Sequence, residues 1–261
     1  MNNFEKDVKE RYDSWGNLRN IEESMKEVQE TLDEENFSRK NSRLVFSVCP
    51  DDINRVEDRK TVENALKGEY NGEFHLGGLG AYPIGGVSGI TAASHHPPDD
   101  ANGGERKEGN LIFFISPHFG VIEQKNFTYG KVIRPGQEKI TSSCGAMMGF
   151  LAQLTEAGSA ESFSIAADDN EVDPTRMVLQ QQLIANHSDE LDKILTLEDQ
   201  NDQVVDLFKL NYDLVWGKGT EMIDEFLEMN HFEGGIAAIG GITVNLPEED
   251  VFITKEITTI K

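Results

Sequence analysis

A run of five apolar residues, 111–115, constrains the fold of this chain more than any other feature. Most of these residues are β-branched or aromatic and the run is too short for a helix, so it predicts a strand buried on both faces of a parallel sheet. Pro117 cannot donate to a sheet ladder and Gly120 permits a tight turn, so we expect the strand to end at Ser116. His118 would then lie where the strand ends and the loop begins. In open α/β sheets, ligands bind at this edge.

The only two cysteines occupy comparable positions in the chain. Residues 43–48 predict a second buried strand, which Cys49 follows directly, and Cys144 lies in a turn of small residues before an amphipathic helical run. Two thiolates and an imidazole meeting at one sheet edge would form a three-ligand zinc site with an open fourth position. The spacing leaves three interpretations open: this zinc site, a pair of inert buried cysteines, or a redox pair, which the absence of a C-x-x-C motif disfavours.

The residues after Cys49 favour the zinc site. Asp51 lies two residues beyond the thiolate, and Arg55 lies four residues after Asp51, a spacing that permits a salt bridge on one face of a helix. The simple interpretation is a helix cap with an exposed ion pair, worth under about 1 kcal/mol. In a zinc site, Arg55 would hold Asp51 away from the metal and leave it to accept a proton from zinc-bound water.

Length and charge limit the class of protein. A chain of 261 residues can bury a large core and suits one α/β domain. A net charge of −23 repels phosphate backbones and anionic lipids, so we expect neither nucleic acid nor a membrane as partner. No apolar window of about 18 residues and no signal pattern is present, so we expect a cytoplasmic protein.

Hydrophobic spacing predicts the remaining elements. Residues 4–35 predict an amphipathic helix, or two with a break near Gly16, either packed on the sheet or forming a dimer arm. We therefore divide the chain into an N-terminal helical arm, 1–37, and an α/β domain, 38–261. Asp51 or Asp52 would cap a helix running through Leu66. We also predict a functional glycine- and histidine-rich loop at residues 74–104 and a C-terminal hairpin at residues 235–257. Helices are predicted at residues 173–187, 191–216 and 219–229.

Several short motifs together resemble a known family. Cys49-x-Asp51 with Arg55, His118 and Cys144 is similar to the zinc site of β-type carbonic anhydrases, although Arg55 comes two residues later than in their C-x-D-x-R motif. The chain resembles the limiting-CO2-inducible B (LCIB) family, or θ-class carbonic anhydrases, more closely. The residues that carry this likeness are His75-Leu-Gly-Gly, Ser94-His95-His96-x-Pro98-Asp99-Asp100, Pro117-His118-x-Gly120, Gly136-Gln137, Ser143-Cys144-Gly145-Ala146 and Gly240-Gly241-Ile242.

The resemblance implies a β-carbonic-anhydrase-like fold, a mostly parallel sheet flanked by helices, in a homodimer. It also implies one zinc per chain on Cys49, His118 and Cys144, with Asp51 and Arg55 as the catalytic dyad. The implied reaction is attack of zinc-bound hydroxide on CO2 to give bicarbonate and a proton. The alternative is a catalytically weak zinc scaffold or regulatory protein of inorganic carbon handling. His95 or His96 would relay the proton or only hold the glycine-rich loop, and Gln137 would line the pocket.

Overall fold

Strand β4 (Asn110–Ser116) lies at the centre of a mixed sheet. The computed structural model describes residues 3–57, 59–98, 109–165 and 172–261, and within them the sheet has eight strands. Around β4 the order is β1-β10-β9-β4-β2-β3, with the flanking strands β1 (Asn17–Asn20), β10 (Asp250–Thr259), β9 (Ile236–Asn245), β2 (Ser42–Val48) and β3 (Asn71–His75). The pairs β3–β2, β2–β4 and β4–β9 are parallel, whereas β9–β10 and β10–β1 are antiparallel. The expected mostly parallel α/β sheet is confirmed.

Both faces of β4 are buried, as its uninterrupted apolar run predicts. Leu111, Phe113 and Ile115 belong to the core cluster on one face, and Ile112 and Phe114 belong to the cluster on the other. All five side chains are at most 2% exposed. Successive side chains of a strand point to opposite faces, so a strand between two helical layers needs apolar residues at every position.

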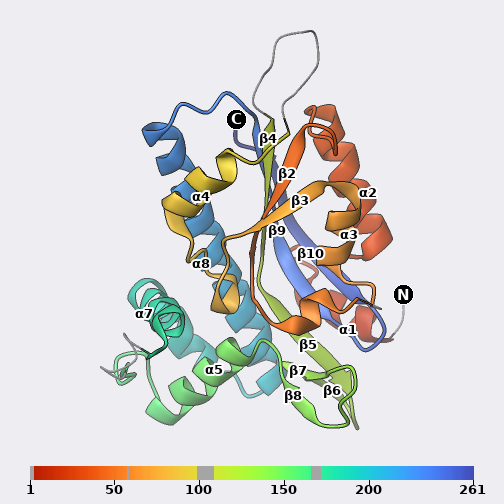
Figure 1. Cartoon of the computed structure of the whole chain (residues 1–261). Coiled ribbons are helices and arrows are strands. Elements are labelled where there is room, and N and C mark those ends of the chain that lie inside the picture. Colours follow the sequence, from red (N-terminus) through yellow and green to blue (C-terminus); the bar gives the residue numbers. More distant parts are fainter. Residues whose placement is uncertain (1–2, 58, 99–108, 166–171) are drawn as a thin grey trace.

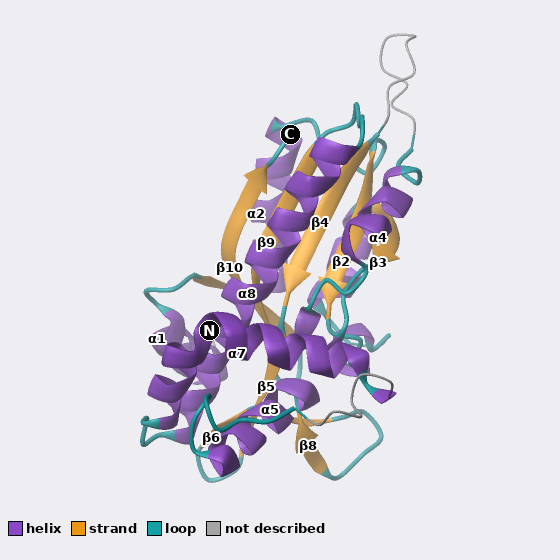
Figure 2. Ribbon diagram, turned by 90° about the vertical axis from the view of Figure 1, so that its left-hand side faces the viewer, coloured by secondary structure: helices purple, strands orange, loops and turns teal. Residues whose placement is uncertain are grey.

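Helices form these two layers, as Figures 1 and 2 show. On one face, α2 (Ile21–Glu34) and α3 (Val62–Glu69) cover the sheet. On the other, α4 (Gly86–Ser94) and the long α8 (Gln200–Met229) lie against it. In the described part of the chain, no helix combines the length and apolar character needed to cross a bilayer.

The N-terminal segment is built into the sheet and the core. Helix α1 (Asn3–Tyr12) buries Val8 and Tyr12 in the larger cluster, and Arg11 forms ion pairs with Asp199 and Asp202 at the start of α8. The expected break near Gly16 is a short strand, β1, which pairs with β10. A Cβ at Gly16 would lie 2.9 Å from the carbonyl oxygen of Thr254, so glycine permits this close pairing.

Three other expectations of the sequence require correction. The segment after Cys49 is not one helix but a short 3₁₀ helix, η1 (Asp52–Arg55), followed by α3, because Asp51 caps the first and Thr61 caps the second. The described part of residues 74–104 is no long loop, since it contains η2 (Leu79–Ala81) and α4; residues 99–104 lie outside the described residues. The helices expected at 191–216 and 219–229 are instead the end of α7 (Pro174–Leu195) and the single helix α8.

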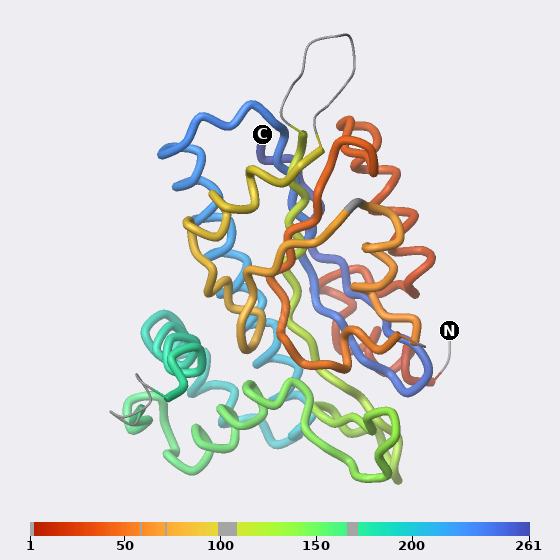
Figure 3. The backbone as a smooth tube through the Cα atoms, in the orientation of Figure 1, coloured from red at the N-terminus to blue at the C-terminus, as the bar shows by residue number. Residues whose placement is uncertain are grey.

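Beyond the carboxyl end of β4, a second group of elements follows. It comprises β5 (His118–Glu123), β6 (Phe127–Tyr129), β7 (Lys131–Ile133), β8 (Ile140–Ser142) and α5 (Gly145–Ala157). His118 is the first residue of β5, which pairs in parallel with the end of β9, so it does not begin a loop as expected. In Figure 3, the chain leaving β2 turns toward the β7–β8 segment at this end of the sheet.

Candidate metal centre

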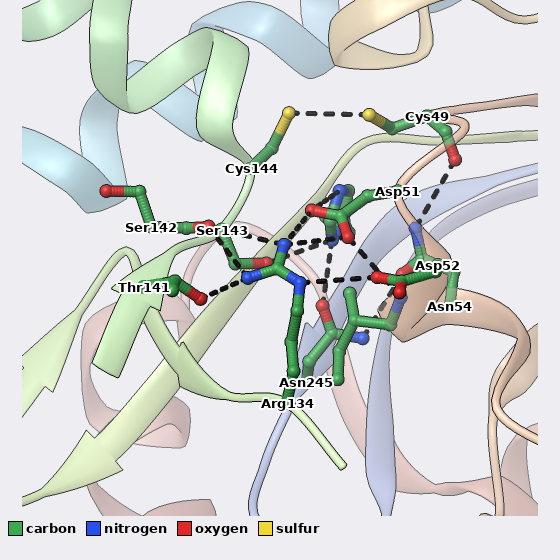
Figure 4. A network of polar contacts seen from close by, with 12 residues as sticks. Cys49, Asp51, Asp52, Asn54, Arg134, Thr141, Ser142, Ser143, Cys144 and Asn245 are labelled. Atoms are coloured by element: carbon green, nitrogen blue, oxygen red, sulfur yellow. Dashed lines mark hydrogen bonds and ion pairs between the residues drawn. The ribbon is translucent and has the colours of Figure 1, made fainter. Parts of the chain in front are cut away.

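Three buried side chains converge at the carboxyl end of the parallel strands. The ligand atoms of Cys49, His118 and Cys144 all lie within 4.8 Å of one another. The two sulfur atoms are 3.5 Å apart, and none of the three residues is more than 2% exposed (Figure 4). The sequence therefore identified residues that the fold brings together from positions up to 95 apart in the chain.

Each of these residues is placed by an element boundary. Cys49 follows β2, and Gly77 packs so closely on this strand end that a Cβ there would lie 2.3 Å from backbone atoms of Val48. His118 begins β5 immediately after Pro117 interrupts the ladder. Cys144 is the N-cap residue of α5. Strand ends and a helix start thus direct three side chains into one space.

The electrostatics of the triad favour a negative sulfur beside a positive ring. The hydrogen bond with Cys49 has the largest effect on the pKa of Cys144 and, together with His118, holds it well below its ordinary value. The same hydrogen bond raises the pKa of Cys49. Burial opposes the charge on His118, but Cys144 and Asp51 outweigh it and raise the pKa of His118 to about 9. Metal ligands must be deprotonated, so metal uptake by this site must release protons.

The residues fit a zinc ion. Tetrahedral geometry with Zn–S bonds of about 2.3 Å puts two sulfur ligands about 3.8 Å apart, close to the distance between Cys49 and Cys144. Nε2 of His118 is buried and has no hydrogen-bond partner among the described residues, which is costly for a polar atom unless a ligand occupies that position. His118 and the two thiols form a possible three-ligand metal site.

Asp51 lies beside the triad and is held by an arginine. Its Oδ2 is 3.9 Å from Nε2 of His118, and both of its carboxylate oxygens accept hydrogen bonds of 2.8 Å from Nη2 of Arg134 (Figure 4). Burial opposes ionisation of Asp51, but His118 and Arg134 outweigh it and hold its pKa below the ordinary value. The carboxylate is therefore ionised at neutral pH and turned toward Arg134.

Arg55 is not the partner of Asp51, contrary to the sequence-based expectation. Its Nε donates to Oε2 of Glu63 at 2.8 Å, and the Glu63 side chain is only 4% exposed. The i,i+4 spacing brings two side chains together on an α-helix, whereas residues 52–55 form a single 3₁₀ turn in which this spacing does not align Asp51 with Arg55. The arginine beside Asp51 is Arg134, on the hairpin between β7 and β8.

The other expected pocket residues lie away from the triad. Arg43, at the start of β2, donates to the carbonyl oxygen of His96, whereas Cys49 follows the other end of this strand, about 20 Å away at 3.3 Å per residue. His95 caps the C-terminus of α4 next to His96, and both are exposed, so neither lies where a direct proton relay requires it. Gln137 is exposed in the turn between β7 and β8, and its N–H donates to the carbonyl oxygen of Arg134.

Sequence reasoning missed two residues of the site. Arg134 precedes Pro135-Gly136-Gln137, a turn that the sequence reveals, but the target of its side chain depends on how the hairpin folds back. Asn245 ends β9, and its Oδ1 lies 2.8 Å from Nδ1 of His118. Its only sequence signal is its place at a strand end, where ligand sites occur in α/β sheets.

Comparison with known proteins agrees with this fold. The crystal structure of PtLCIB4, a homologue of the limiting CO2-inducible protein LCIB, has a TM-score of 0.77 at 23% identity and covers 97% of each chain. The crystal structure of LCIB itself has a TM-score of 0.62 at 16% identity over 98% of this chain and 97% of that one. At these identities the likeness concerns the fold. No curated protein matches the chain in sequence.

The sequence itself matches a family model almost from end to end. The match covers residues 19–260 and belongs to the model described as limiting CO2-inducible proteins B/C β-carbonic anhydrases. It includes every residue of the triad as well as Asp51, Arg134 and Asn245. The chain therefore belongs to this carbonic-anhydrase-like family.

Proposed function

We propose that this chain reversibly hydrates CO2 to bicarbonate and a proton, with one zinc ion held by Cys49, His118 and Cys144. The observation that carries the proposal is the convergence of three metal-ligating atoms next to an ionised carboxylate that an arginine holds in place. Family membership supports the same reaction. Two thiolates and an imidazole favour zinc over the harder metals magnesium, calcium and manganese.

Zinc bound here supplies a Lewis acid that makes a nucleophile from water at neutral pH. Asp51, beside the triad, would accept a hydrogen bond from the water that reacts with CO2. Arg134 engages both oxygens of Asp51 and would so compete with a metal for the carboxylate, keeping Asp51 from acting as a ligand.

The reaction also needs a way in for CO2 and a way out for the proton. The side chains of Asp51 and Arg134 are 11% and 18% exposed, whereas the three ligands are buried. The site therefore opens on the side of the Asp51–Arg134 pair, and we expect substrate and proton to pass there.

Metal analysis followed by a stopped-flow CO2 hydration assay tests the proposal. We expect one zinc per chain and hydration above the uncatalysed rate. Zinc without hydration would favour the alternative of a zinc-bearing scaffold. Absence of zinc, with a Cys49–Cys144 disulfide, would instead favour thiol redox chemistry, for which the two sulfurs are already close.

We further propose a homodimer in which the N-terminal segment, 1–37, contributes to the contact. A truncation at Ser38 is a poor test, because it would remove the buried residues Val8, Tyr12 and Val28 from the core. Light scattering should give twice the mass of one chain. Lysine cross-linking of mixed light and heavy isotope protein should join Lys6 or Lys9, on α1, to the other copy. Intermolecular cross-links confined to lysines outside residues 1–37 would contradict the role of the arm.

A further inference from the structure

Asn245 is a buried amide at the end of β9 that contacts His118 and two further polar side chains. It is 1% exposed. Its Oδ1 lies 2.8 Å from Nδ1 of His118, and its Nδ2 donates to Oδ1 of Asn54 at 3.2 Å and to Oδ1 of Asp250 at 3.1 Å. We propose that Asn245 is a positioning residue, which fixes the ring of His118 with Nε2 free for the metal and links it to the loop of Cys49. The inference rests on the proposed zinc site but not on CO2 hydration.

The orientation of the amide follows from the acid behind it. Oδ1 of Asp250 accepts a hydrogen bond of 2.9 Å from Nη2 of Arg59, and the Asp250 side chain is fully buried. An ionised carboxylate can only accept hydrogen bonds, so the NH2 group of Asn245, not its oxygen, must face Oδ1 of Asp250. Oδ1 of Asn245 is then left to face His118.

This orientation determines which nitrogen of His118 carries the proton in the metal-bound state. An amide oxygen can only accept, so Nδ1 of His118 must donate, and the lone pair of the neutral ring then lies on Nε2. Nε2 is the nitrogen that is buried without a partner among the described residues. Ligating histidines are generally held in this way by an acceptor behind the ring.

The same amide reaches a second ligand. Asn54, which accepts from Asn245, donates through its own Nδ2 to the carbonyl oxygen of Cys49 at 3.4 Å. Asn245 therefore joins the strand that carries His118 to the turn that carries Cys49. Ser143 offers a competing contact to Nδ1 of His118, but at 3.4 Å it is longer than that of Asn245.

Zinc affinity measured by competition with a chromophoric chelator tests the role of Asn245. Asn245→Ala should weaken zinc binding about 10- to 100-fold, the usual effect of losing such a partner. Asn245→Asp should also weaken it, because a carboxylate would then face Asp250. The exchange variant Asn245→Asp with Asp250→Asn restores an acceptor for His118 and a donor behind it at unchanged net charge, but not the donation to Asn54, so it should recover only part of the zinc affinity that Asn245→Asp loses.

Two controls separate positioning from loss of structure. Thr243→Val, on the same strand, removes a buried hydrogen bond of 2.9 Å to Ser116 that does not reach His118. Ser143→Ala removes the longer contact to the ring. Thr243→Val should keep wild-type zinc affinity, even if its unfolding midpoint falls, and Ser143→Ala should lose less zinc affinity than Asn245→Ala. An equal loss of affinity in Thr243→Val would make the effect of Asn245 a general structural one and overturn the proposal.

The wild-type protein gives a test that needs no variant. In the zinc-loaded chain, long-range ¹H–¹⁵N NMR should show the ring proton of His118 on Nδ1 and none on Nε2. A proton on Nε2, or zinc affinity unchanged within threefold in Asn245→Ala, would overturn the proposal. Zinc that binds as described here without CO2 hydration would refute the proposed function alone. A wild-type chain that takes up no zinc would refute both.

Discussion

Replacing Cys144 with alanine should reduce the zinc content from one ion per chain to less than about a tenth, and should lower thermal stability. When only the folded chain binds a metal, the free energy of binding adds to the free energy of folding. Losing one of the three ligands should therefore remove the zinc and the stability that zinc contributes. Elemental analysis after dialysis measures the zinc content. Thermal unfolding with and without added zinc measures the stability, and the stabilisation that zinc gives wild type should be absent from the variant.

Ser47→Ala is a suitable control for Cys144→Ala. Ser47 is buried near the end of β2, and its hydroxyl donates to the carbonyl oxygen of Ala81 at 2.9 Å. This variant should lose some stability but keep its zinc. Full zinc occupancy in a Cys49→Ala, Cys144→Ala double variant would show that the metal is held elsewhere.

The second large effect separates two arginines. Arg134→Ala should lower CO2 hydration about 100-fold while zinc content stays near that of wild type, because Asp51 loses the group that holds it away from the metal. Arg55→Ala should keep hydration within a few-fold of wild type, since Arg55 pairs with Glu63 instead. Stopped-flow hydration at matched zinc content measures both.

Stability should rank these two variants in the opposite order to activity. Arg55→Ala leaves the buried carboxylate of Glu63 without its cation, so its unfolding midpoint should fall more than that of Arg134→Ala, whose side chain interacts at a partly open site. Asp51→Ala should match Arg134→Ala in activity. A severe loss of hydration in Arg55→Ala, with Arg134→Ala unaffected, would show that Arg55 is the functional partner of Asp51, as the sequence spacing suggests.

The sequence predicts the parts of this protein whose signal is local. The apolar runs of β4 and β2, residues 111–115 and 44–46, are buried on both faces of the sheet, and Pro117 and Pro50 follow the ends of these strands. Cys49 and His118 come just after the ends of β2 and β4, and Cys144 lies in the turn of small residues before α5, so each could be proposed as a metal ligand from its local sequence. For this reason the triad could be named before its residues were seen to meet.

The parts that were missed depend on how distant segments pack. Arg55 has the right residue type at a plausible spacing, but η1 is a 3₁₀ turn, and Arg55 turns to Glu63 on α3. Arg134 reaches Asp51 only because the β7–β8 hairpin folds back over the end of the sheet, a contact across 83 residues. The proposed role of Asn245 depends on side chains that the fold brings next to it, among them His118 and Asp250. No periodicity in the sequence predicts these contacts.

CO2 hydration by the zinc-loaded wild-type chain, followed by stopped-flow with a pH indicator, tests the central claim most directly. The same preparation should be assayed as loaded, after removal of zinc by a chelator, and after zinc is restored. We expect hydration well above the uncatalysed rate in the first sample, its loss in the second and its recovery in the third. A rate equal to the uncatalysed one, from protein shown to hold one zinc on Cys49, His118 and Cys144, would contradict it.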